Sequence, residues 1–150
     1  MKDLHMKELS EEARTLCLAS LEIRKSAYAP YSKFKVGAAL RTDTGLVIDG
    51  CNVENASYGL SICAERSACV KAVSQGYTNF TAIAIAGDLE TDEFCGPCGA
   101  CRQFLAEFNP EIPIYLVRVH DMKVQKTTLG ILLPESFSPR RCQFPFLNGK

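Results

Sequence analysis

Cys63-Ala64-Glu65 and Pro97-Cys98-Gly99-Ala100-Cys101 are the two stretches from which this chain is best understood, because together they supply three thiols and one carboxylate. Zinc prefers four tetrahedral ligands, and a site with three protein ligands keeps the fourth position for a water molecule that the metal makes nucleophilic. The three cysteines are therefore enough to build a catalytic zinc site. In such a site Glu65 carries a proton and does not bind the metal.

Both stretches lie where the sequence predicts the start of a helix. Cys98 and Cys101 are three residues apart and share one helix face, and Pro97 suits a helix start because it has no amide hydrogen to satisfy. Cys63 likewise precedes a predicted helix. The positive end of a helix dipole lowers the pKa of a nearby thiol and favours metal binding. We therefore expect the metal site between two helix starts.

Arg66 follows Cys63 by three residues and is the candidate for balancing the charge of the site. Three thiolates outweigh the charge of one zinc ion and would weaken it as a Lewis acid. Hydrogen bonds from Arg66 to the ligand sulfurs would offset this excess. The alternative is an ordinary surface salt bridge.

Segments with the apolar spacing of helices alternate along the chain with segments typical of strands. This order predicts an α/β fold with three layers, α/β/α, around a mixed central sheet of about five strands. Asp43-Thr44-Gly45 predicts a hairpin turn, and the strand over 81–86 is expected to be central because it is apolar on both faces. The predicted helices cover 10–27, about 62–76, 98–108 and a short turn at 129–133; the predicted strands cover 34–41, 46–51, 81–86, 112–119 and 124–128.

Length and charge limit the class of ligand. The chain has 150 residues, with 17 Lys and Arg against 17 Asp and Glu. This length predicts one domain over residues 1–150, with loosely ordered tails at 1–8 and 140–150. Without a basic excess, binding to nucleic acid loses its usual electrostatic driving force. A small neutral or weakly charged ligand is favoured.

The N-terminus is charged throughout, and no apolar run approaches the length of a signal-peptide core or a membrane span. We therefore expect a cytoplasmic protein with no membrane partner. The eight cysteines then indicate metal binding, catalysis or buried packing instead of disulfides. Neither histidine lies near a motif. The residues without ligand spacing are Cys17, Cys51 and Cys69, expected to be buried, Cys142, expected in the tail, and His5 and His120.

The cysteine motifs, together with the segments Phe34-Lys35-Val36-Gly37-Ala38-Ala39 and Gly50-Cys51-Asn52-Val53-Glu54-Asn55-Ala56, resemble the small homotetrameric zinc-dependent cytidine deaminases of pyrimidine salvage. The resemblance extends from about Ser26 to Pro139. It implies hydrolytic deamination of cytidine and deoxycytidine to uridine and deoxyuridine plus ammonia. It also implies one zinc ion per chain and a homotetramer whose subunits share their active sites.

The resemblance assigns a role to each motif residue. It makes Cys63, Cys98 and Cys101 the zinc ligands, with Glu65 passing a proton from water to ring N3 and then to the departing amine. It places Asn52 and Glu54 on the ribose hydroxyls, although such residues also commonly cap loops. The other substrate-binding residues that it implies are Phe34, Ala64, Tyr58 at the pocket edge and Phe137 reaching into a neighbouring subunit; Tyr31 resembles an interface residue.

Cys95 is a departure from the resemblance and leaves two alternatives for the metal site. With Cys63, Cys98 and Cys101 it could close a four-cysteine structural zinc site, or it could form part of an iron–sulfur run. Either would leave no place for water. A third alternative keeps the zinc chemistry but changes the substrate to RNA, DNA, a nucleotide or a nucleoside antibiotic. The neutral charge and Glu54 argue against polynucleotides and nucleotides, because a carboxylate repels a phosphate.

Overall fold

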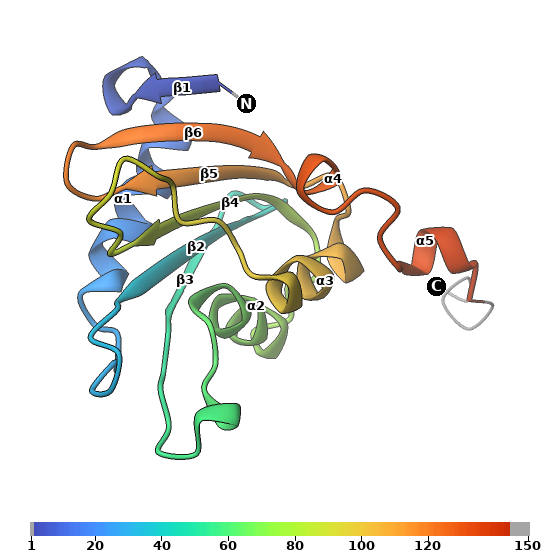
Figure 1. Cartoon of the computed structure of the whole chain (residues 1–150). Helices are drawn as coiled ribbons and strands as arrows, with labels where there is room; N and C mark the ends of the chain where they lie inside the picture. Colours follow the sequence, from blue (N-terminus) through green and yellow to red (C-terminus); the bar gives the residue numbers. More distant parts are fainter. Residues whose placement is uncertain (1, 145–150) are drawn as a thin grey trace.

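A computed structural model describes residues 2–144 and has a six-stranded mixed sheet with helices on both faces (Figure 1). The strand order is β1-β6-β5-β4-β2-β3, and β4 pairs in parallel with β5 while the remaining pairs are antiparallel. The strands are β1 (Lys2–His5), β2 (Val36–Thr42), β3 (Val47–Cys51), β4 (Phe80–Gly87), β5 (Pro113–Arg118) and β6 (Lys123–Thr128). The helices are α1 (Glu11–Arg24), α2 (Ala64–Ser74), α3 (Gly99–Phe108), α4 (Leu129–Leu132) and α5 (Pro139–Cys142), with 3-10 turns η1 (Met6–Glu8) and η2 (Tyr58–Leu60).

The two faces of the sheet carry different side chains, which confirms the predicted three layers. Alternate residues of a strand face opposite sides. On β2 and β4, Leu40, Ile83 and Ile85 pack into the core beneath α2, α3 and α4. Ala39 and Ala84 face the other way, into the core beneath α1. Both faces of β4 are thus covered, and it lies between β2 and β5, as predicted for the central strand.

Local sequence explains where several elements begin and end. Ser10 caps α1 by accepting a hydrogen bond from the Ala13 N–H at 3.3 Å. The chain leaves α2 through Gly76, whose φ is 90°, and Gly45 turns the β2–β3 hairpin with a φ of 85°. Both angles lie in the left-handed region that glycine adopts without a steric cost.

The expectation of a loose tail over residues 1–8 is wrong for the residues that the structure describes. Lys2–His5 form β1, which pairs antiparallel with β6 and raises the strand count from the expected five to six. Leu4 and Met6 then pack against the core beneath α1. The charge of this segment concealed the strand, because Lys and Asp are depleted in strands. At the other end, residues 139–142 form α5, while 145–150 of the predicted C-terminal tail lie outside the described residues.

The cysteines without ligand spacing occupy the kinds of place expected of them, except that Cys51 is only half-buried. Cys17 and Cys69 are buried in the two cores, and burial raises the pKa of each thiol to about 12. Cys142 is exposed on α5. Among residues 2–144, no helix has the length and apolar character needed to cross a bilayer.

At Gly37 on β2, α1 approaches the sheet closely. A Cβ atom at this position would overlap the backbone carbonyl oxygen of Ser20 and the backbone of Arg24. Gly50 on β3 meets the backbone of α2 at Ala68 in the same way. Glycines on neighbouring strands therefore let helices on opposite faces approach the sheet closely.

The substitution Gly37→Ala tests this packing. Because the added methyl group would displace helix backbone and not a flexible side chain, we expect the free energy of unfolding to fall by about 3 kcal/mol in urea titrations. Gly59→Ala is the matched control, since nothing lies within 4 Å of a Cβ there. We expect it to change stability by less than about 0.5 kcal/mol. Equal stability of the two variants would contradict the close approach of α1.

Candidate active site

The three predicted zinc ligands meet at the starts of two helices. Cys63 is the N-cap of α2, Cys98 is the N-cap of α3, and Cys101 lies in the first turn of α3. Their sulfur atoms all lie within 4.8 Å of one another. The sequence motifs predicted that the two helix starts meet, and the structure confirms this within one chain.

The spacing of the sulfur atoms fits zinc. Two sulfurs bound to a tetrahedral zinc ion at about 2.3 Å are separated by about 3.8 Å. The Sγ atoms of Cys63 and Cys98 are 3.8 Å apart. Three converging thiols at this spacing are a donor set for zinc, with a fourth position left for a non-protein ligand.

Arg66 contacts the group of three cysteines as expected. Its Nη2 donates to Cys63 Sγ at 3.5 Å from one turn further along α2. Hydrogen bonds from Cys101, Arg66 and Cys98 lower the pKa of the Cys63 thiol to about 5, although partial burial opposes this shift. The sulfurs of Cys63 and Cys101 raise the pKa of the Arg66 guanidinium. Arg66 therefore supports the thiolate form that a metal requires, and it is more than a surface ion pair.

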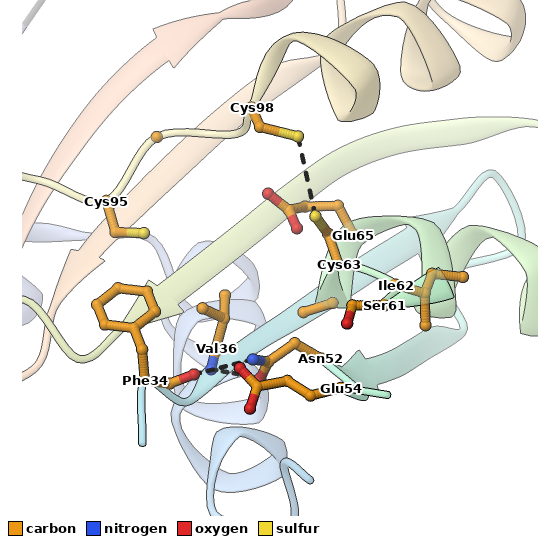
Figure 2. Close-up of a pocket in the computed structure, with 12 residues that line it drawn as sticks. Phe34, Val36, Asn52, Glu54, Ser61, Ile62, Cys63, Glu65, Cys95 and Cys98 are labelled. Atoms are coloured by element: carbon orange, nitrogen blue, oxygen red, sulfur yellow. Dashed lines mark hydrogen bonds between the residues drawn. The ribbon is translucent and has the colours of Figure 1, made fainter. Parts of the chain in front are cut away.

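Glu65 is the buried acid of the site. It lies in the first turn of α2 with 4% of its surface exposed, and Figure 2 shows its carboxylate close to Cys63. Burial raises its pKa to about 7, and the negative charge on Cys63 acts in the same direction. A carboxyl group with a pKa near neutrality both accepts and donates a proton at physiological pH.

A cavity of about 300 Å³ opens beside the cysteines and has the size of a small-molecule site. In the view of Figure 2, Cys98, Cys63 and Glu65 lie above Asn52 and Glu54. Ala64 lines the cavity as the resemblance implied. The cavity is lined by Phe34, Val36, Asn52, Glu54, Ser61, Ile62, Cys63, Ala64, Glu65, Cys95, Gly96 and Cys98.

Asn52 and Glu54 line the cavity and also hold its walls together. Asn52 Oδ1 accepts from the Val36 N–H at 2.8 Å, and its Nδ2 donates to the Phe34 carbonyl at 2.9 Å. Glu54 Oε1 accepts from the N–H groups of Tyr31 and Ser32 at 3.0 and 3.1 Å. Both residues therefore bind loop backbone within the chain, as the loop-capping alternative predicted. Those contacts still leave one Asn52 N–H and part of the Glu54 carboxylate without a partner among the described residues.

Two predicted substrate-binding residues do not line the cavity of their own chain. Tyr58 lies on η2 with 75% of its surface exposed and meets Tyr31 edge to face, the ring centroids being 5.7 Å apart. Together they line a neighbouring hollow that also includes Glu54. Phe137 is 65% exposed on the C-terminal segment, where its carbonyl accepts from Gln103 Nε2 at 2.7 Å. Its predicted place in a neighbouring subunit stays a prediction.

Several wall residues were not assigned from the sequence. Val36 lies inside a quoted motif, but only the strand direction reveals that it faces the cavity. Ser61 and Ile62 immediately precede Cys63, and a bridge between Ile62 and Val53 brings them to the wall. Their position next to the predicted zinc ligand Cys63 in the sequence could have identified these two residues as wall residues.

Cys95 lies outside the group of three cysteines that could hold the metal. The group of mutually close donors among the described residues consists of Cys63, Cys98 and Cys101. Cys95 instead covers Gly87 at the end of β4, where a Cβ atom would come within 2.6 Å of its sulfur. Burial raises the pKa of this thiol to about 11, so it is neutral at physiological pH. This arrangement supports neither the closed four-cysteine site nor the iron–sulfur site.

The fold and the site together define a class of protein. A helix-covered mixed sheet that presents three cysteines and a buried glutamate at two helix starts is the arrangement of zinc-dependent nucleobase deaminases. Residues 10–116 match the family described as the cytidine and deoxycytidylate deaminase zinc-binding region. The chain belongs to this family.

Curated relatives and solved structures agree with this assignment. Cytidine deaminase of Sporosarcina psychrophila is 45% identical over 128 residues, which cover 85% of this chain and 92% of the relative. The probable cytidine deaminase of Dictyostelium discoideum is 46% identical over 131 residues, 87% of each chain. The crystal structure of cytidine deaminase from Burkholderia pseudomallei matches with a TM-score of 0.77 and 48% identity, over 86% of this chain and all of that one. The enzyme from Mycobacterium tuberculosis matches with a TM-score of 0.71 and 36% identity, over 85% and 98% of the two chains.

The substitution Cys95→Ser tests which thiols bind the metal. Because its sulfur lies outside the cluster, we expect the purified variant to keep one zinc ion per chain in elemental analysis. Cys98→Ala is the comparison and should lose most of its zinc, since two thiols do not hold the ion in a tetrahedral site. Loss of zinc from Cys95→Ser would restore the four-cysteine alternative, and full occupancy in Cys98→Ala would remove Cys98 from the ligands.

Proposed function

We propose that this protein hydrolyses cytidine and deoxycytidine to uridine and deoxyuridine with release of ammonia, as part of pyrimidine nucleoside salvage. The observation that carries the proposal is the buried Glu65 beside three zinc-competent cysteines, at one end of a cavity of about 300 Å³. The names of the curated relatives support it, since these proteins are cytidine deaminases.

The reaction forms a bond from water oxygen to C4 of the pyrimidine and breaks the bond from C4 to the exocyclic nitrogen. When bound by Cys63, Cys98 and Cys101, zinc supplies the Lewis acidity that makes water nucleophilic at neutral pH. Glu65 accepts a proton from the attacking water and delivers it to ring N3. Glu65 then takes the remaining proton from the oxygen now bonded to C4 and delivers it to the exocyclic nitrogen, which leaves as ammonia while the C4 carbonyl forms. A pKa of about 7 suits a group that must both accept and donate.

Arg66 and the cavity walls serve the same reaction in different ways. Arg66 donates to Cys63 and offsets the negative charge of the three thiolates. Phe34 and Ala64 line the cavity and provide the surface against which the base packs. Water is displaced from the site by these apolar contacts, which strengthens the electrostatic interactions around Glu65.

Asn52 and Glu54 are proposed to bind the ribose hydroxyls. Both line the cavity at the end away from the cysteines, and both keep hydrogen-bonding capacity beyond their contacts within the chain. A carboxylate accepts from a hydroxyl but repels a phosphate, so nucleosides are favoured over nucleotides. The balance of 17 basic and 17 acidic residues likewise disfavours polynucleotides.

We also infer a homotetramer in which Phe137 reaches a neighbouring active site. Large apolar side chains are exposed along α2, α3, α4 and the segment after α4, and covering such side chains with another copy removes them from water. These residues are Val70, Val73, Phe104, Ile131 and Phe137. A mass measurement in solution tests the assembly. A cytoplasmic location is proposed because all eight cysteines are free, as expected in a reducing compartment.

The activity is tested by following the loss of the cytosine absorbance band of cytidine with purified, zinc-assayed protein. Deoxycytidine, cytidine monophosphate and a cytosine oligonucleotide are measured alongside. We expect rapid conversion of the two nucleosides and at least about 100-fold slower conversion of the two phosphate-containing substrates, since a misplaced charge costs several kcal/mol. Equal rates on the oligonucleotide would favour a nucleic-acid deaminase. No conversion despite one zinc ion per chain would overturn the proposed activity.

The role of Glu65 is tested by Glu65→Gln, which keeps the shape of the side chain but removes its ability to carry a proton. We expect zinc content to be retained and kcat on cytidine to fall by about 10³-fold, within the range for loss of a general acid–base group. Glu22→Gln is the matched control, because Glu22 is exposed on α1 and pairs there with Lys25. Turnover at the wild-type rate by Glu65→Gln would show that another group moves the proton.

A further inference from the structure

Ser32 joins the two sides of the cavity mouth through one hydroxyl group. Ser32 Oγ donates to Glu54 Oε2 and accepts from the Phe34 N–H at 3.0 Å. The chain of hydrogen bonds thus runs from the Phe34 backbone through Ser32 to the Glu54 carboxylate. Each donor in such a chain polarises the next, which strengthens both bonds. Glu54 and Phe34 both line the cavity, whereas Ser32 itself lies beside it.

The remaining contacts of Glu54 show what the Ser32 hydroxyl controls. An ionised carboxylate offers about four acceptor sites. Oε1 accepts two hydrogen bonds, from the N–H groups of Tyr31 and Ser32 at 3.0 and 3.1 Å. Oε2 accepts one hydrogen bond, from the Ser32 hydroxyl. The capacity left over lies on Oε2. Rotation of the carboxylate about its last bond is therefore restrained at Oε1 by backbone and at Oε2 by a single side chain.

We propose that Ser32 is a positioning residue, whose hydroxyl fixes the Glu54 carboxylate so that the free capacity of Oε2 meets a sugar hydroxyl of the nucleoside. The inference rests on the proposed function, in which Glu54 accepts from the ribose. It adds a residue that does not touch the base or the reacting atoms. The Ser32 hydrogen bond is also the largest cause that lowers the pKa of Glu54, so it keeps the carboxylate in its accepting form.

The surrounding backbone is held independently of the Ser32 hydroxyl. Tyr28 N–H donates to the Asn52 carbonyl at 3.0 Å, and the Tyr28 carbonyl accepts from the Glu54 N–H at 2.8 Å. Asn52 separately holds the carbonyl of Phe34 at 2.9 Å. Removal of the hydroxyl also frees the Phe34 N–H, but this donor is exposed and can bind water instead. The segment before β2 therefore stays attached, and the main effect should fall on the Glu54 carboxylate.

The experiment compares Ser32→Ala and Ser32→Thr on cytidine and on 2′,3′-dideoxycytidine, which lacks the hydroxyls that Glu54 is proposed to bind. We expect Ser32→Ala to lower kcat/KM on cytidine about tenfold, mainly through KM, because a hydrogen bond to a charged group is weakened. Its kcat/KM on the dideoxynucleoside should stay within about twofold of wild type. Ser32→Thr keeps the hydroxyl and should restore most of the loss on cytidine.

A matched control and a double variant separate positioning from general damage. Ser57 lies in the neighbouring loop, and its hydroxyl makes no hydrogen bond within residues 2–144, so Ser57→Ala should leave both substrates unaffected. In a Glu54→Gln background, Ser32→Ala should cause no further tenfold loss, because the two residues act as a unit.

Equal losses on both nucleosides, or no loss on either, would overturn the positioning role. So would a wild-type enzyme that does not distinguish the two sugars, since Glu54 would then not bind the hydroxyls. A wild-type protein that deaminates neither nucleoside would instead contradict the proposed function.

Discussion

The approach of two helix starts is the constraint on which the rest of the site depends. Cys63 and Cys98 cap α2 and α3, and their sulfurs are 3.8 Å apart. The sheet makes this meeting possible, because α2 leads into β4, α3 leads into β5, and these two strands are parallel. When two helices on one face of a sheet each lead into one of two parallel strands, both helices begin at the same edge of the sheet, beyond the carboxyl ends of those strands. The single parallel pair among the described strands thus places both cysteine motifs together.

Electrostatics at this meeting point favours the charge state that each group requires. Helix starts stabilise thiolates, and Arg66 donates to Cys63, whose pKa is lowered by hydrogen bonds from Cys101, Arg66 and Cys98. The buried Glu65 responds in the opposite direction, since burial and the nearby thiolate both raise its pKa. One helix turn therefore holds a thiol that readily loses its proton and a carboxyl group that readily keeps one. This division is what separates a metal ligand from a proton carrier.

Much of this could be predicted from the sequence, because local signals and local contacts coincide. Ser10, Gly45 and Gly76 mark the ends of elements, and the spacing of Cys98 and Cys101 requires only one helix turn. The sequence did not predict several other features that depend on distant segments. β1 forms by pairing with residues more than 100 positions away, and the half-buried Cys95 packs over Gly87 across a loop. The acceptor role of Glu54 within the chain depends on N–H groups 22 and 23 residues before it, whose direction no motif encodes.

The two ends of the cavity are therefore built on different physical principles. The metal end is formed by helix termini packed on a rigid sheet, and its donors are aimed by backbone geometry. The sugar end is formed by side chains of Asn52 and Glu54 that bind the backbone before β2, so the groups proposed to meet the ligand are the same groups that hold the wall. A ligand hydroxyl adds to this network and does not replace it, because the contacts within the chain leave acceptor and donor capacity unused. Ligand binding at this end should consequently stabilise the wall, whereas at the metal end the fold has already placed the donors.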